Sequence, residues 1–223
     1  NNTFFTKHEI LLDERISLIA ITDVNNDEWP DIVYTGEPPV SSAYLINQQN
    51  ISFTKPFCIS STTLYAPSVT TLDIDYDNDL DVICLTQENE IALFRNNGLA
   101  EFDANEIIKD TGFSVGVYSK IHTADLDGDS HNDLFITGIN DAYWFKSLGP
   151  DLFGPPQSLL GNNVPNAIYE SNKADIDNDN DIDLLFRTGS RIEILINNGS
   201  GNFSLNDKII HGVDSIIDFA IAD

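Results

Sequence analysis

The residues best suited to chemistry in this sequence are aspartates that recur at a fixed spacing. From Asp125 to Asp133, carboxylates occupy relative positions 1, 3, 5 and 9, with a glycine at position 4. Closely similar stretches begin at Asp23, Asp73 and Asp175, about fifty residues apart. Carboxylates held about 4 Å apart repel each other by several kcal/mol per pair, and no Lys or Arg lies inside these stretches. A divalent cation is therefore the expected partner.

The four stretches are named acidic loops 1 to 4 (23–31, 73–81, 125–133 and 175–183). Ligands that are all oxygen select a hard ion, and a short loop rich in oxygens suits Ca²⁺ better than Mg²⁺, which keeps its waters. Positions 1, 3, 5 and 9 would bind through side chains and position 7 through its backbone carbonyl. The predicted metal ligands are Asp23, Asn25, Asp27, Trp29, Asp31, Asp73, Asp75, Asp77, Asp79, Asp81, Asp125, Asp127, Asp129, His131, Asp133, Asp175, Asp177, Asp179, Asp181 and Asp183.

About four Ca²⁺ ions are expected, one in each loop. Loop 1 is expected to bind most weakly, because Asn25 stands where the other loops have a charged residue. The alternative is four solvated polar turns without an ion. One such turn would be ordinary, but four turns with the same register at the same period favour the metal sites.

A helical calcium motif is excluded by the residue at position 12. An EF-hand loop shares positions 1, 3 and 5 but requires a glutamate there, whereas this chain has Tyr34, Cys84, Ile136 and Phe186. The tight turn needs residues that tolerate a positive φ. Asn26, Gly128 and Asn178 at position 4 and Asn78 and Asn180 at position 6 meet this need, whereas Tyr76 at position 4 does not.

Each acidic loop is expected to join the first two strands of a four-stranded unit. Short runs rich in Ile, Val, Phe and Tyr between turns are typical of strands, and Asn-Gly between such runs indicates a hairpin. The expected first strands are 16–22, 69–72, 115–124 and 168–174, and the second strands are 31–34, 81–84, 133–136 and 183–186. The third strands are 43–46, 91–95, 142–146 and 192–196, and the fourth are 53–59, 102–108, 153–160 and 203–210.

Four-stranded units that recur about every fifty residues predict an all-β chain, a β-propeller with antiparallel blades. We expect one domain over 1–223, with repeats at 1–46, 47–95, 96–146 and 147–196 and a partial repeat at 197–223. Residues 1–12 match a fourth strand and 213–223 match a first strand. The expectation is four complete blades with flanking single strands, a fragment of a longer propeller.

The acidic loops, together with hairpins such as Asn96-Asn97-Gly98 followed by Phe102, resemble FG-GAP or VCBS repeats. These repeats form integrin alpha-subunit propellers and occur in many secreted bacterial and fungal proteins. The resemblance implies roughly seven blades, with Ca²⁺ in each acidic loop. It does not fix a ligand, because the family includes adhesins, lectins, toxin modules and domains attached to polysaccharide-active enzymes.

The charge of the chain limits its partners. A net charge of −25 with 11 Lys and Arg argues against nucleic acid and against anionic membrane surfaces, and no apolar run reaches the ~20 residues of a membrane span. The expected function is a non-catalytic calcium-binding module, secreted or at the cell surface, that acts in adhesion or binds a protein or glycan ligand. An extracellular location fits sites that use millimolar Ca²⁺. The alternative is the propeller domain of a polysaccharide lyase or hydrolase, or of a toxin.

Other residues give weaker expectations. No Ser/His/Asp or Cys/His pattern has catalytic spacing. Cys58 and Cys84 lie in apolar runs and are expected to be buried thiols, with a disulfide as the alternative. Aromatic side chains in sheet proteins usually lie in the core, although they also form sugar-stacking surfaces. The candidates are Trp29, Trp144, Tyr65, Tyr118, Tyr143 and Tyr169.

Overall fold

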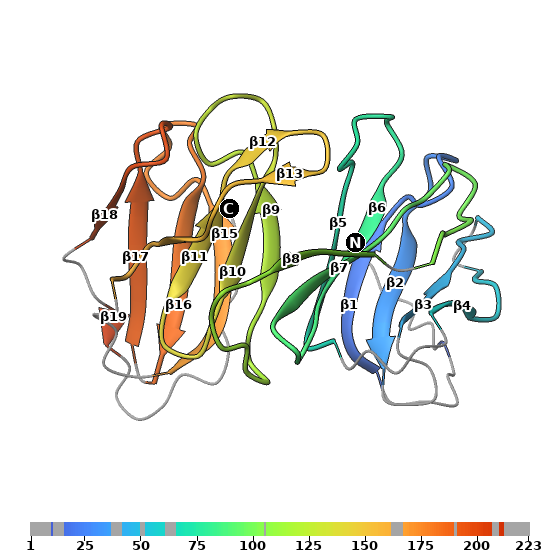
Figure 1. Cartoon of the computed structure of the whole chain (residues 1–223), viewed down its shortest axis with the longest axis horizontal. Helices are drawn as coiled ribbons and strands as arrows, with labels where there is room; N and C mark the ends of the chain where they lie inside the picture. The colour runs from blue at the N-terminus through green and yellow to red at the C-terminus, as the bar shows by residue number, and fades with distance from the viewer. Residues whose placement is uncertain are drawn as a thin grey trace, which may run out of the picture.

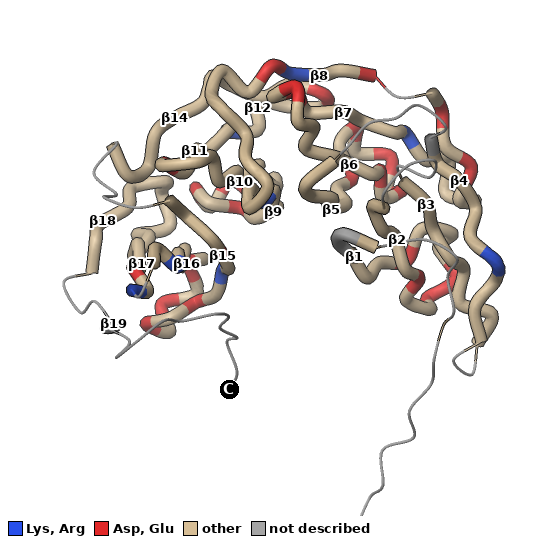
Figure 2. The backbone as a smooth tube through the Cα atoms, turned by 90° about the horizontal axis from the view of Figure 1, so that it is seen from below, with Lys and Arg blue, Asp and Glu red and all other residues tan. Residues whose placement is uncertain are grey.

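The computed structural model describes residues 10, 16–36, 42–49, 52–60, 66–104, 106–161, 167–189, 191–206 and 210–211. Within these ranges the chain is all β, and its four main sheets stand in sequence along an arc (Figures 1 and 2). The strands expected at 1–12 and 213–223 lie largely or wholly outside the described residues. No helix in the described part of the chain is long and apolar enough to cross a membrane.

Each main sheet corresponds to one expected unit of first to fourth strand, and we name the sheets blades 1 to 4. Blade 1 contains β1 (Ile16–Thr22), β2 (Asp31–Gly36), β3 (Ser42–Leu45) and β4 (Phe57–Ser60). Blade 2 contains β5 (Ser68–Leu72), β6 (Asp81–Leu85), β7 (Glu90–Phe94) and β8 (Glu106–Asp110). All neighbouring strands pair antiparallel in chain order. This confirms the predicted four-stranded unit.

The second half of the chain repeats the unit with additions. Blade 3 contains β9 (Ile121–Ala124), β10 (Asp133–Thr137), β11 (Ala142–Phe145) and β14 (Gln157–Ser158), and a separate hairpin is formed by β12 (Ser147–Gly149) and β13 (Leu152–Phe153). Blade 4 contains β15 (Ile168–Ala174), β16 (Asp183–Thr188), β17 (Arg191–Asn197) and β18 (Phe203–Leu205). A further strand, β19 (Ile210–His211), also pairs with β17.

The predicted first strand of blade 3 is too long at its start. It was expected from Val115, but β9 begins at Ile121. The preceding residues turn instead, because the Ser119 N–H donates to the Gly116 carbonyl at 2.9 Å and the Gly116 N–H donates to Ser119 Oγ at 2.9 Å. Apolar residues in this segment therefore gave a false strand signal.

The predicted fourth strands begin too early in blades 1 to 3, because the phenylalanine after the hairpin does not start the fourth strand there. In blade 4, Phe203 does begin the fourth strand, β18, but this strand ends at Leu205. In every blade this phenylalanine pairs across the hairpin with a residue at the end of the third strand or just after it. The four pairs are Asn47–Phe53, Asn96–Phe102, Ser147–Phe153 and Asn197–Phe203. The fourth strand proper begins several residues later in blades 1 to 3. The third strand and this pairing therefore hold the hairpin above the acidic loop of the same blade.

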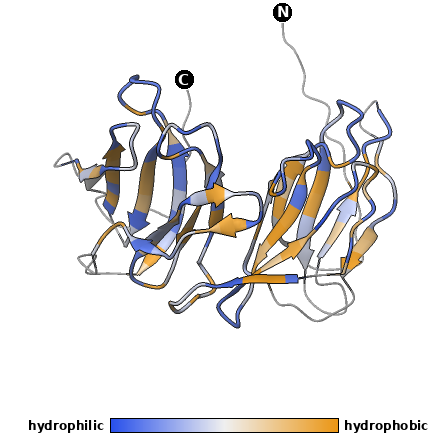
Figure 3. Ribbon diagram, turned by 45° about the horizontal axis from the view of Figure 1, so that its top comes forward, coloured by the Kyte–Doolittle hydropathy of each residue, from blue (hydrophilic) through white to orange (hydrophobic). Residues whose placement is uncertain are grey.

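The hydrophobic core lies between successive blades. Every residue of β6 and β10 is buried, because both faces of these inner strands are covered. Between blades 3 and 4, the rings of Phe135 and Phe186 meet edge to face with centroids 5.5 Å apart. Figure 3 shows hydrophobic residues concentrated in the strands and hydrophilic residues in the connecting loops. Burial of this apolar surface supplies the main stabilisation of each interface.

The two cysteines have different surroundings. Cys84 is buried in β6, as expected, and its Sγ lies 3.8 Å from Ser42 Oγ. Cys58 is exposed, so the prediction that it is buried was wrong. It lies in β4, the outermost strand of blade 1 among the described residues.

His122 should make the stability of blades 3 and 4 depend on pH. Its ring stacks on Phe135 and its Nε2 lies 2.9 Å from Ser171 Oγ on β15. Burial, with Lys173 and Lys120 nearby, lowers its pKa from 6.5 to about 3. Below pH 6.5 the unfolded chain therefore binds a proton that the folded chain does not. Between about pH 6 and pH 4, this group should reduce the free energy of unfolding by about 1.4 kcal/mol per pH unit.

A glutamine at this position provides the comparison. His122→Gln retains a hydrogen-bonding side chain but does not titrate, so its stability should fall less steeply on acidification. The measurement is the urea midpoint at several pH values in chelator, which removes metal binding from the comparison. Parallel pH profiles for the two proteins would show that His122 is not the group responsible.

Candidate metal centres

The backbone of all four acidic loops turns at the same two positions. The residues at position 4 have φ between 57° and 74°, and those at position 6 have φ between 68° and 73°. The residues are Asn26, Tyr76, Gly128 and Asn178 at position 4, and Glu28, Asn78, Ser130 and Asn180 at position 6. The predicted turn geometry is confirmed, but the expectation that Tyr76 would not fit it was wrong.

Tyr76 is held in the left-handed conformation by contacts with blade 3. Its hydroxyl lies 3.1 Å from Ser147 Oγ, and its ring meets the His131 imidazole edge to face at 4.9 Å. A left-handed conformation costs a non-glycine residue roughly 1–2 kcal/mol. The two contacts offset that cost at the interface between blades 2 and 3.

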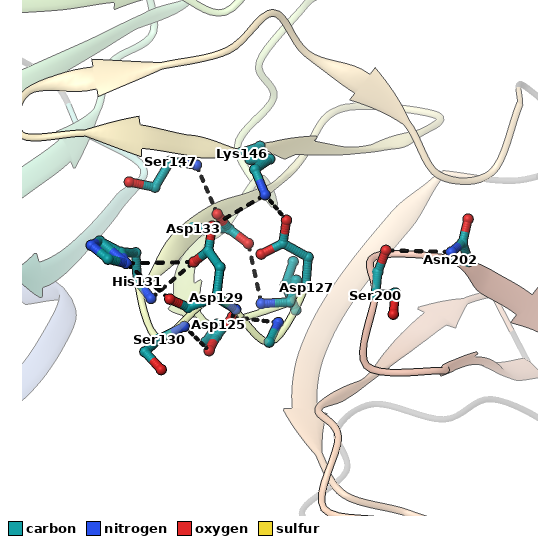
Figure 4. Close-up of polar contacts among 12 residues, drawn as sticks. Asp125, Asp127, Asp129, Ser130, His131, Asp133, Lys146, Ser147, Ser200 and Asn202 are labelled. Atoms are coloured by element: carbon teal, nitrogen blue, oxygen red, sulfur yellow. Dashed lines mark hydrogen bonds and ion pairs between the residues drawn. The ribbon is translucent and has the colours of Figure 1, made fainter.

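The aspartate at position 1 closes each turn from inside, as Figure 4 shows for loop 3. In loop 3, Asp125 Oδ1 accepts the N–H of Gly128 at 2.8 Å, and Oδ2 accepts the N–H of Ser130 at 2.8 Å. The position-1 residues Asp23, Asp73 and Asp175 accept backbone N–H groups in the same way. The carboxylate is thereby fixed in orientation before any ion binds.

The aspartate at position 9 joins the loop to the hairpin of its own blade. Asp133 is fully buried; its Oδ2 accepts the Leu126 N–H at 3.1 Å and its Oδ1 accepts the Ser147 N–H at 2.7 Å. The equivalent residues Asp31, Asp81 and Asp183 accept the same pair of N–H groups. Burial raises the pKa of Asp81 to about 6 and also raises those of Asp31 and Asp133.

Three of the four loops bring carboxylates together closely enough to share an ion. In each, ligand oxygens from three aspartates lie within 4.8 Å of one another. The trios are Asp73, Asp75 and Asp77; Asp125, Asp127 and Asp133; and Asp175, Asp177 and Asp183. Loop 1 forms no such trio among its described residues, which agrees with its expected weakness. The remaining predicted ligands, including the carbonyls at position 7, stay predictions.

The residues at position 7 differ in where their side chains lie. The carboxylates of Asp79 and Asp181 lie against Gly98 and Gly199 of the hairpin in the same blade, where no room is left for a Cβ. A Cβ would displace these side chains, and the positive φ of Gly98 (74°) and Gly199 (71°) favours glycine in the Asn-Asn-Gly hairpins whatever the space. Trp29 and the His131 side chain are exposed.

Two buried carboxylate oxygens are suited to binding a cation. Asp75 Oδ1 and Asp127 Oδ1 are inaccessible and accept no hydrogen bond from the described residues. The Asp127 side chain is only 9% exposed. A buried charged oxygen without a partner is costly, and the surrounding donor set consists of hard oxygen ligands. The residues present therefore fit a divalent metal ion at position 3 of loops 2 and 3.

The sequence alone did not reveal two basic side chains that reach these loops from the end of the third strand. Arg95 Nη1 lies 3.0 Å from Asp75, and its Nη2 lies 2.8 Å from Asp151. Lys146 Nζ contacts Asp127 and lies 3.1 Å from Asp129 Oδ2. Both residues directly precede the hairpin residue that bonds position 9. That position in the repeat is the signal that could have identified them.

Loops 1 to 3 are also bonded to the next blade. The backbone carbonyl at position 2 accepts a hydrogen bond from the following hairpin in all three described interfaces. The bonds run from Asn96 Nδ2 to the Val24 carbonyl (2.7 Å), from the Asp151 N–H to the Ile74 carbonyl (3.0 Å) and from Asn197 Nδ2 to the Leu126 carbonyl (2.9 Å). In loops 1 to 3, the carbonyl oxygen at position 2 of the acidic loop is therefore also part of the interface with the next blade.

The candidate aromatic residues are scattered through the described structure. Trp144 is buried and meets Phe203 edge to face at 6.4 Å, whereas Trp29 is 41% exposed. Tyr118 and Tyr169 contact each other with centroids 5.3 Å apart. The other two are Tyr143, which stacks on Phe113 in the core, and Tyr65, which lies outside the described residues.

Comparisons with known proteins agree with this geometry. An Agrocybe aegerita lectin structure, described as recognising non-reducing terminal N-acetylglucosamine, is 18% identical with a TM-score of 0.63; the match covers 86% of this chain and 51% of the lectin. A structure of BBS1N in complex with ARL6DN is 12% identical with a TM-score of 0.54, covering 96% of this chain and 57% of that one. These likenesses show the fold, and the chain spans about half the length of each.

No curated protein sequence matches this chain. The FG-GAP-like repeat family matches residues 23–84 and 73–136, which together span half of the chain and contain acidic loops 1 to 3. The matched segments begin at the first aspartates of loops 1 and 2 and end within the second strand of blades 2 and 3. The chain therefore belongs to the family of FG-GAP-like repeat proteins.

Proposed function

We propose that this chain is a calcium-binding β-propeller module of a secreted or cell-surface protein, and that it binds a protein or glycan ligand rather than catalysing a reaction. The observation that carries the calcium assignment is the buried, unpartnered Oδ1 of Asp127, within a trio with Asp125 and Asp133. Hard oxygen donors in a small loop favour Ca²⁺. All four loops take an ion in this proposal, and loop 1 binds it most weakly.

The role of the ion follows from the bonds of the loop. When bound, Ca²⁺ supplies positive charge that offsets the repulsion among the carboxylates. The chain holds these carboxylates in place through the backbone N–H groups bonded to Asp125 and Asp133. Because Leu126 also bonds the hairpin of blade 4, a well-ordered loop 3 supports the interface between the blades. Binding of metal is thereby linked to stability.

The ligand-binding part of the proposal is supported by fold and charge. A lectin chain shares the fold, and the net charge of −25 disfavours nucleic acid and anionic membranes. An extracellular location fits calcium sites of extracellular modules, which fill at millimolar Ca²⁺. A glycan array probed with and without Ca²⁺ tests for a sugar ligand. Pull-down with extracellular matrix proteins tests for a protein ligand.

Removal of metal tests the calcium assignment directly. A ligand whose free concentration is a hundred times its Kd for a site stabilises the folded protein by about 2.7 kcal/mol. A change of 1 kcal/mol shifts the melting temperature of a domain of this size by about 2–4 °C. EGTA should therefore lower the melting temperature by about 5–10 °C for each such site. Excess Ca²⁺ should restore it, and equal Mg²⁺ should restore it less. A melting curve that does not change in EGTA would contradict the proposal.

A further inference from the structure

The four acidic loops differ in one residue at the end of the third strand. This residue directly precedes the hairpin residue whose N–H donates to the aspartate at position 9. In loops 1 and 4 this residue is isoleucine, and in loops 2 and 3 it is basic. The residues are Ile46, Arg95, Lys146 and Ile196. Their equivalence is fixed by the next residue, whose N–H donates to Asp31, Asp81, Asp133 or Asp183 at 2.7–2.8 Å.

Lys146 lies among the predicted ligands of loop 3. Its Nζ contacts Asp127 Oδ2 at position 3 and lies 3.1 Å from Asp129 Oδ2 at position 5 (Figure 4). The Asp127 side chain is nine-tenths buried, and its other oxygen has no partner. The ammonium group therefore neutralises one side of the carboxylate cluster. Asp127 Oδ1, which has no partner, remains available to bind a second cation.

Arg95 occupies the corresponding place in loop 2. It pairs with Asp75 at position 3 and extends to Asp151 on the hairpin of blade 3, and its Nη2 lies 3.8 Å from Glu106. Asp75 Oδ1 also has no partner among the described residues. Arg95 thus both neutralises loop 2 and joins it to the next blade.

Loop 4 has no such neutralising residue. Asp175, Asp177 and Asp183 bring their oxygens within 4.8 Å of one another, and none of the three pairs with a Lys or Arg of the described residues. Ile196 cannot supply charge. The carboxylates of loop 4 therefore repel each other unless an external cation is bound.

We propose that the residue preceding the hairpin sets the calcium affinity of loops 2 to 4, whose position-3 residue is an aspartate in every case, and this inference rests on the calcium-binding function proposed above. Lys146 and Arg95 weaken the binding of Ca²⁺ to loops 3 and 2, because a divalent ion enters beside a fixed positive charge. The same residues hold these loops in shape without metal. Loop 4 is the tight site, and the dependence of stability on metal is concentrated there.

Removing the basic residue beside loop 3 and introducing one beside loop 4 tests this assignment, and we call the two substitutions exchanges. The probe is Ca²⁺ alone, titrated calorimetrically into chelator-stripped protein. The wild type should show one tight site and weaker ones. Lys146→Met should tighten a weak site by about tenfold or more, giving two tight sites, and should lower the melting temperature in EGTA. Ile196→Lys should weaken the tight site by a similar factor and reduce the effect of EGTA on melting.

A matched control removes charge elsewhere. Lys55→Met deletes one positive charge from an exposed position outside the acidic loops and should leave the binding curve unchanged. If the wild type shows no heat of Ca²⁺ binding, the proposed function fails and this inference fails with it. If the wild type binds Ca²⁺ but neither exchange changes an affinity, this inference alone is overturned. Because the two exchanges act on different blades, misfolding of one variant leaves the other decisive.

Discussion

Replacing Asp133 with asparagine should destabilise the protein by about 3 kcal/mol or more, even in the absence of metal. The carboxylate is fully buried and accepts one backbone N–H on each oxygen, from Leu126 and from Ser147. An asparagine has only one acceptor oxygen, so its amide group would face a donor N–H. Loss of a hydrogen bond to a charged acceptor and an unsatisfied buried N–H each cost about 1–3 kcal/mol.

The same loop offers a control for this variant. Asp129 is exposed, and its acceptance of the His131 N–H at 3.0 Å can be reproduced by an asparagine. Asp129→Asn should therefore change the urea midpoint little in EGTA, although both variants should weaken Ca²⁺ binding. If Asp133→Asn in EGTA changes the urea midpoint as little as Asp129→Asn does, the two backbone hydrogen bonds of Asp133 do not stabilise the metal-free fold and the prediction is contradicted.

Gly128→Ala should cost about 2–4 kcal/mol, the second-largest effect expected. Gly128 has φ +74°, and a Cβ there would lie 2.8 Å from the Gly199 carbonyl oxygen of blade 4. The left-handed backbone disfavours alanine by roughly 1–2 kcal/mol. The backbone contact adds to this, because Gly199 cannot move without disturbing the neighbouring bond from Asn197 to Leu126. The substitution therefore strains the turn and separates two blades.

Gly112→Ala isolates the effect of the contact. Gly112 has a similar φ of +77°, but the nearest atom to a Cβ would be Pro156 Cγ at 3.7 Å, an ordinary contact. Chemical denaturation of both variants should show about 1 kcal/mol of loss at Gly112 and clearly more at Gly128. Indistinguishable losses would mean that only backbone conformation matters at position 4.

Local patterns in the sequence predicted the parts of the structure that depend on neighbouring residues. The strand–loop–strand units and the turns at positions 4 and 6 follow from alternating apolar runs and from residues such as Asn78 and Gly128. Tyr76 departed from its own preference because contacts from Ser147 and His131, in another blade, decide its conformation. Val115 and Val117 resembled a strand because their composition is apolar, but Gly116 and Ser119 determine a turn.

The charges around the metal centres could not be predicted in this way. Lys146 follows Asp127 by nineteen residues, and its contact requires the register of β11 against β10. Arg95 likewise lies twenty residues from Asp75, outside the nine residues of its loop. The one signal that the sequence holds is that Arg95 and Lys146 occupy equivalent positions in two repeats.

The bonds from the position-2 carbonyls of loops 1 to 3 to the next hairpin couple the four described blades as a one-dimensional array of nearest neighbours. Such arrays lose structure at a boundary that moves from one repeat to the next. A perturbation at Leu126 should therefore be felt in blade 4 through Asn197 and fade with each further interface. Partly unfolded molecules should keep contiguous runs of blades, and hydrogen exchange should show protection that falls stepwise toward an unravelling end.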